Sequence, residues 1–265
     1  MYTLNDIMNW LFIDIETVSE EKDLETLKEK NPVKAELWKK RCEYLRRRYV
    51  ECEEMNDADL YQEKAGLHAE FCKIICICLG VYQGNGAAQI IGIAKEKDEA
   101  ATIRTAFSII TKMKNAVYNK SRTATMWLAG HNIKRFDVPV MCKRALMHKI
   151  ELPEILMIHN KKPWEMGFID TAEVWSFGTW QESFTSLELL TNVLGIPSPK
   201  ADMHGSDVQE IYWNCGRWST DPAPQDALKM ITHYCQDDVI AAMNVVLDWS
   251  SLPLVDFEKA VRVTS

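Results

Sequence analysis

The sequence predicts an α/β fold in which a mixed five-stranded sheet is flanked by helices. Short apolar runs typical of buried strands come early in the chain, and segments with apolar residues three and four positions apart dominate its second half. The 265 residues are 47% hydrophobic and 26% charged, which is an ordinary globular composition with ample chain for a core. We therefore expect one domain over residues 1–265.

The first strand is expected at residues 10–16, an apolar run interrupted by two acids and ended by the polar Thr17. Side chains alternate along a strand, so Asp14 and Glu16 project from the same side. Two carboxylates at the end of a buried strand repel each other and lose hydration, and a cation between them would offset both effects. Alternatively, Asp14 caps a neighbouring element and Glu16 is solvated.

A charged segment follows the first strand. Residues 20–65 combine Lys/Glu alternation with few β-formers and partial helical spacing. This pattern predicts an insertion of two or three helices.

The remaining elements follow from periodicity and turn residues. Strands at 73–82 and 88–94, joined by the turn at 83–86, predict a hairpin beside the first strand. The other segments are strands at 124–129 and 167–170 and helices at 98–115, 137–148, 184–194, 205–214 and 224–249.

The eight cysteines lie mostly in apolar segments, which favours buried free thiols in a reducing compartment. Alternation predicts that Cys72, Cys76 and Cys78 share one packed face, so we interpret them as core residues rather than metal ligands.

The net charge of −7 argues against a protein that coats nucleic acid. It leaves room for an enzyme that holds a polyanion through local basic groups and bound cations. No run approaches the roughly 20 apolar residues of a membrane span, and the N-terminus lacks a signal-peptide pattern. We therefore expect a cytoplasmic protein that binds no membrane.

The 124–129 strand runs into the segment 130–139. Pro139 is tolerated only in the first turn of a helix, so the following helix is expected to start near Asp137. Asp137 would then lie just past the carboxyl end of a strand, where α/β sheets bind ligands. The alternative is an ordinary N-cap. Asp170 ends the 167–170 strand, where we expect it to form a turn.

Asp238 lies in the middle of the apolar stripe of the last helix. A carboxylate there needs a compensating partner, and a metal ion is a good one. Tyr234 lies one turn earlier on the same face. Asp237 points about 100° away and is expected to be exposed.

Together, Asp14-x-Glu16, Asn132-x3-Phe136-Asp137 and Tyr234-x3-Asp238 resemble, in order, the three exonuclease motifs of the DEDD superfamily of 3′–5′ exonucleases. The tyrosine makes the chain most similar to the proofreading domains of family-B DNA polymerases and to the stand-alone predicted exonucleases related to them. The resemblance covers about residues 10–249 without the 20–65 insertion, and it implies a ribonuclease H-like fold.

One alternative remains inside the third motif. His233 precedes Asp238 by five residues, which is the spacing of the histidine-type subfamily. Helical geometry favours Tyr234, because His233 is displaced from Asp238 by about 140°.

The resemblance implies that Asp14, Glu16, Asp137 and Asp238 bind two divalent cations. All-oxygen ligation selects hard ions, so we expect Mg²⁺ or Mn²⁺. Asp14 would bridge the metals, and Tyr234 would orient the attacking water or help to deprotonate it.

The resemblance also assigns substrate contacts. Thr17, Asn132 and Phe136 would bind the terminal nucleotide, and the loop at 200–207 would lie near the site.

The predicted function is a metal-dependent 3′–5′ exonuclease that acts on DNA, at single-stranded or frayed 3′ ends. An RNA substrate is an open variant, because the same four acids serve both polymers. The rival interpretation is a non-catalytic nucleic-acid-binding domain on the same fold. Retention of all four acids speaks against that rival.

Overall fold

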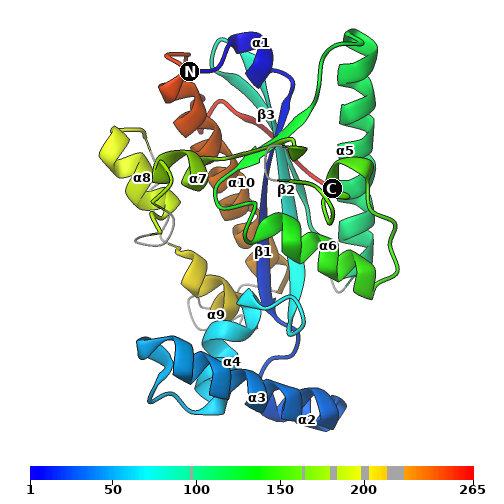
Figure 1. Ribbon diagram of the computed structural model, residues 1–265, viewed down its shortest axis with the longest axis vertical. Helices are drawn as coiled ribbons and strands as arrows, with labels where there is room; N and C mark the ends of the chain where they lie inside the picture. Colours follow the sequence, from blue (N-terminus) through cyan, green and yellow to red (C-terminus); the bar gives the residue numbers. More distant parts are fainter. Residues whose placement is uncertain (96–97, 163–164, 180–183, 198–202, 214–223) are drawn as a thin grey trace.

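The computed structural model describes residues 1–95, 98–162, 165–179, 184–197, 203–213 and 224–265 (Figure 1). A six-stranded sheet in the order β5-β4-β1-β2-β3-β6 forms its centre. The strands are β1 (Trp10–Ser19), β2 (Cys72–Gly84), β3 (Ala87–Ile93), β4 (Trp127–Gly130), β5 (Phe168–Asp170) and β6 (Val261–Thr264).

The sheet is mixed, as predicted. β1 and β3 both pair antiparallel with β2, while the pairs β1–β4, β4–β5 and β3–β6 are parallel. The sheet has one strand more than the five expected. The additional strand, β6, is four residues long and largely exposed, so it carries no apolar run that marks it in the sequence.

Helices cover both faces of the sheet. The α-helices are α1 (Leu4–Ile7), α2 (Leu24–Lys30), α3 (Pro32–Arg48), α4 (Asp57–Lys64), α5 (Glu99–Lys120), α6 (Asp137–Met147), α7 (Thr171–Ser176), α8 (Leu187–Leu194), α9 (Val208–Trp213) and α10 (Pro224–Trp249). Short 3₁₀ helices are η1 (Val50–Cys52), η2 (Ala65–Leu67), η3 (Glu154–Leu156) and η5 (Gly205–Asp207).

Two apolar cores sandwich the sheet. Phe12 and Ile90 pack with Val239 of α10 on one face, whereas Ile13 packs with Ile103 of α5 on the other. Figure 1 shows α10 on one side of the strands and α5 and α6 on the opposite side. The mixed sheet between helical layers agrees with the ribonuclease H-like fold that the resemblance implies.

The segment between β1 and β2 forms α2, α3 and α4, which lie together at one end of the sheet (Figure 1). These helices have an apolar core of their own. The Trp38 and Tyr61 rings pack edge to face with centroids 5.3 Å apart, and both side chains are fully buried.

A β-bulge in β2 changes the direction of its side chains. Glu16 pairs with Cys76 and Thr17 with Ile74, so Ile75 is an extra residue in β2. Consequently Cys72 packs on the α5 face, and Cys76 and Cys78 pack on the α10 face. The prediction that the three cysteines share one face was wrong, because it assumed unbroken alternation.

None of the helices within the described ranges has the length and apolar character needed to cross a membrane.

Candidate active site

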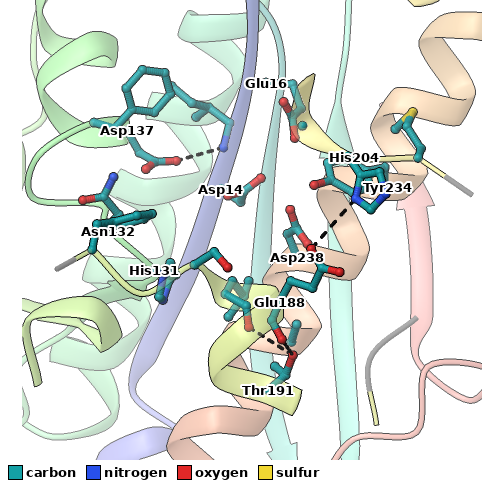
Figure 2. Close-up of a pocket in the computed structure, with 18 of the residues that line it drawn as sticks. Asp14, Glu16, His131, Asn132, Asp137, Glu188, Thr191, His204, Tyr234 and Asp238 are labelled. Carbon is teal, nitrogen blue, oxygen red and sulfur yellow. Dashed lines mark hydrogen bonds and ion pairs between the residues drawn. The ribbon is translucent and has the colours of Figure 1, made fainter. Parts of the chain in front are cut away.

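Four acids from three elements meet at one cavity of about 730 Å³, which we call the acidic cavity. Asp14 and Glu16 come from β1, Asp137 from the first residue of α6, and Asp238 from α10. Figure 2 shows these four side chains around a common space. Among the described residues, the cavity is also lined by three further predicted residues, Asn132, Phe136 and Tyr234.

The chain that leaves β4 places the Asn132–Asp137 motif beside the Asp14–Glu16 motif of β1. β1 and β4 run parallel, and their pairing stops at Phe12 and Ala129. A Cβ on Gly130 would lie 2.5 Å from the Ile13 carbonyl oxygen, so only glycine allows the chain to cross this close to β1. Beyond the last ladder pair, the Ile15 amide donates to Asp137 Oδ1 at 3.0 Å (Figure 2).

Asp170 holds the turn that presents Asn132. Its buried carboxylate accepts hydrogen bonds from the amides of Asn132 at 2.8 Å and Lys134 at 2.9 Å, and it also caps α7. Asn132 has a φ of +60°, a left-handed conformation that asparagine tolerates better than most residues. Asp170 thus holds the turn that carries Asn132 in place. It does not itself belong to the described lining of the cavity.

Asp170→Ala is expected to lower the free energy of unfolding by about 2–3 kcal/mol, because it leaves buried amides without an acceptor and removes the α7 cap. Asp170→Asn keeps one oxygen acceptor and should lose about half as much. Urea unfolding monitored by circular dichroism measures both. Equal stability of the alanine variant and the wild type would contradict this role.

Adjacent residues of α10 point in different directions. Tyr234 and Asp238 line the acidic cavity, whereas His233 is exposed and its Nδ1 lies 2.7 Å from Arg262 Nη1. Asp237 was predicted to be exposed and is instead buried, with Oδ1 2.5 Å from Arg262 Nη2. The reason is β6, which supplies Arg262 and covers this side of the helix.

Thr17 lies beside the site rather than in it. Its hydroxyl donates to the Gly66 carbonyl at 2.7 Å, and Thr17 is absent from the described lining of the cavity. Its contact with substrate stays a prediction. Of the loop expected near the site, residues 200–202 lie outside the described residues, while His204 and Gly205 line the cavity.

Sequence reasoning missed much of the cavity wall. The described lining residues to which the sequence assigned no role in the site are Ile15, His131, Phe184, Ser186, Leu187, Glu188, Thr191, Asn192, Ile196 and Ala241. Several belong to α8, a helix that the sequence predicted at 184–194 but did not place at the cavity. Among them, Glu188 adds a fifth carboxylate to the cavity.

Burial and mutual repulsion dominate the electrostatics of the acids. Burial raises the pKa of Asp137 and of Asp238 to about 7. Burial, followed by the charge of Asp137, raises the pKa of Asp14 well above its usual range, and burial and Asp14 do the same to Glu16. No lysine or arginine occurs among the described residues that line the cavity.

The donor set fits hard divalent cations. Asp14 Oδ2 is buried and has no hydrogen-bond partner in the described part of the chain. Oxygen atoms of Asp14 and Glu16 lie within 4.8 Å of each other and of Cys235 Sγ. An unpartnered buried carboxylate oxygen beside a second carboxylate is costly without a cation, and oxygen ligands suit Mg²⁺ or Mn²⁺.

Comparison with known families agrees with this geometry. The model of a family described as a predicted 3′–5′ exonuclease related to the exonuclease domain of PolB matches residues 65–252. No curated protein matches the chain. The matched range contains Asn132, Asp137, Tyr234 and Asp238, and the fold places the β1 acids beside them. The chain belongs to this family of predicted 3′–5′ exonucleases.

Proposed function

We propose that the protein is a metal-dependent exonuclease that removes nucleotides from single-stranded or frayed 3′ ends of DNA. The observation that carries the proposal is the convergence of four acids on a cavity whose described lining contains no lysine or arginine. A phosphodiester is itself anionic, so it can approach these carboxylates only if cations lie between them.

The four acids would hold two Mg²⁺ or Mn²⁺ ions. Such ions, when bound, neutralise the charge that develops on the attacking and leaving oxygens of a phosphodiester. Asp137 Oδ1 accepts from the Ile15 amide, which fixes the carboxylate and leaves Oδ2 available as a ligand. Asp14 offers its unpartnered Oδ2 in the same way.

Tyr234 would position the attacking water. Burial and the nearby Asp238 carboxylate raise the pKa of the Tyr234 phenol well above its usual range, so the hydroxyl keeps its proton at neutral pH. A protonated phenol orients water by hydrogen bonding and does not act as the base.

Aromatic side chains support an unpaired substrate end. Phe136 and Phe184 both line the cavity, and Phe184 is 62% exposed. The His131 ring lies 5.8 Å from that of Phe184, which widens this apolar surface. Stacking on such rings requires a nucleobase that is not paired, and Asn132 supplies polar contacts beside them.

The test is degradation of end-labelled single-stranded DNA, RNA and duplex DNA in Mg²⁺, Mn²⁺ or EDTA. Asp238→Asn and its neighbour Asp237→Asn form a matched pair, because only Asp238 lines the cavity. We expect stepwise, metal-dependent loss from the 3′ end of single-stranded DNA, retained by Asp237→Asn and abolished by Asp238→Asn. Folded wild-type protein that cleaves neither polymer would overturn the proposal, and faster RNA cleavage would reassign the substrate.

Tyr234→Phe is expected to lower kcat by about 100-fold with little change in KM, because it removes the hydroxyl that positions water. His233→Phe should keep most of the activity, since His233 points towards Arg262 rather than into the cavity. Steady-state rates on a single-stranded oligonucleotide measure both. The reverse order of effects would assign the third motif to His233.

A further inference from the structure

Three cysteines form a cluster directly beneath the acidic cavity. Cys76 and Cys78 lie on the α10 face of β2, and Cys235 lies on α10. All three side chains are fully buried, and their Sγ atoms lie within 4.8 Å of one another. We call these three residues the thiol cluster.

The spacing of the thiol cluster is close to that of a metal site. Sulfur ligands of a tetrahedral zinc ion, with Zn–S bonds of about 2.3 Å, lie about 3.8 Å apart. Rotamer adjustments of about 1 Å would therefore bring the three sulfurs onto one ion. Cys78 and Cys235 donate weak hydrogen bonds to backbone carbonyls, to that of Thr232 at 3.6 Å and to that of Asp14 at 3.5 Å respectively.

Carboxylate oxygens lie beside one member of the thiol cluster. Cys235 Sγ lies within 4.8 Å of carboxylate oxygens of both Asp14 and Glu16, which line the cavity. Asp14 Oδ2 is buried and lacks a hydrogen-bond partner among the described residues. An ion at the thiols would thus have carboxylate oxygens beside Cys235 with which to complete its coordination.

We propose that Cys76, Cys78 and Cys235 bind one thiophilic divalent ion, Zn²⁺, with a carboxylate oxygen of Asp14 or Glu16 as the fourth ligand. Thiolates prefer soft and borderline ions, whereas the carboxylates alone prefer Mg²⁺ or Mn²⁺. The thiols bind as thiolates and release their protons to solvent. The two neighbouring sites therefore select different metals.

Binding of Zn²⁺ has a consequence for catalysis, which rests on the proposed function. Because the zinc ion takes a carboxylate oxygen needed by the hard ions, it lowers the Mg²⁺-dependent rate. The binding itself is measured without nucleic acid, so failure of the nuclease proposal leaves the zinc proposal testable.

The experiment titrates Cd²⁺ into the full chain with excess Mg²⁺ and a phosphine reductant, and follows the ultraviolet charge-transfer band of cadmium bound to thiolate. We expect saturation at one ion per chain and a melting temperature raised by about 5–10 °C at saturating Cd²⁺. Cys72→Ala is the matched control, since Cys72 is equally buried in the same strand but faces α5. It should keep the band, and Cys78→Ala should lose it.

Equal bands in Cys72→Ala and Cys78→Ala, or no band with folded wild-type protein, would overturn the proposal. Should Cys78→Ala fail to fold, X-ray absorption at the zinc edge of the wild-type protein decides. About three sulfur neighbours at about 2.3 Å support the site, and oxygen or nitrogen neighbours alone refute it.

Discussion

Asp14→Asn is expected to abolish metal-dependent cleavage while making the metal-free protein more stable. The Oδ2 atom of Asp14 is buried and has no hydrogen-bond partner among the described residues, and the carboxylate is repelled by Asp137 and Asp238. Asparagine has nearly the same shape but no charge, and its amide can donate to the remaining acids. We expect a loss of at least about 10³-fold in kcat, because the proposed metal site would lose one of its carboxylate ligands.

The stability of Asp14→Asn in EDTA should rise by about 1–3 kcal/mol, or about 3–8 °C in melting temperature. Mn²⁺ should stabilise the wild type more than the variant. Asp237→Asn is the control, because it removes an ion pair to Arg262 and should be destabilising instead. An Asp14→Asn protein that is fully active, or less stable than the wild type in EDTA, would contradict the assignment of Asp14 to the metal site.

The acids could be predicted because each one breaks a local pattern. Asp14 and Glu16 interrupt an apolar strand, and Asp238 interrupts an apolar helical stripe, so each signal lies within a few residues of the acid. Pro139 placed Asp137 at the start of α6, and the structure begins that helix at this residue. The three motifs could then be recognised together because they follow one another in the same order as the exonuclease motifs they resemble.

What could not be predicted depends on contacts between distant residues. Arg262 reaches Asp237 only because β6 pairs with β3, and β6 has no apolar pattern of its own. The bulge at Ile75 redirects Cys76 and Cys78 towards Cys235, and no spacing motif marks that approach. The helix at 184–194 was predicted, but its local pattern does not show that α8 lines the cavity.

The metal-free protein is expected to become less stable as the pH rises from about 5 to 8. Unfolded aspartates titrate near 3.9, whereas burial raises the pKa of Asp137 and Asp238 to about 7. Between these values the folded chain holds protons that the unfolded chain has released, so raising the pH favours unfolding. We expect a loss of about 5 kcal/mol over this window, measured by urea unfolding in EDTA.

Divalent ions should remove this pH dependence of the stability. Such an effect would connect the raised pKa values to metal binding by the same carboxylates. Mg²⁺ and Mn²⁺ compete with protons for the same carboxylates, so they should stabilise the protein more at pH 8 than at pH 5.5. The double variant Asp137→Asn/Asp238→Asn should show a flatter profile and a weaker response to Mn²⁺. A wild-type protein whose stability does not fall between pH 5.5 and 8 in EDTA would show that these carboxylates are ionised throughout. Some positive charge other than a bound metal ion would then have to compensate the ionised acids in the metal-free protein.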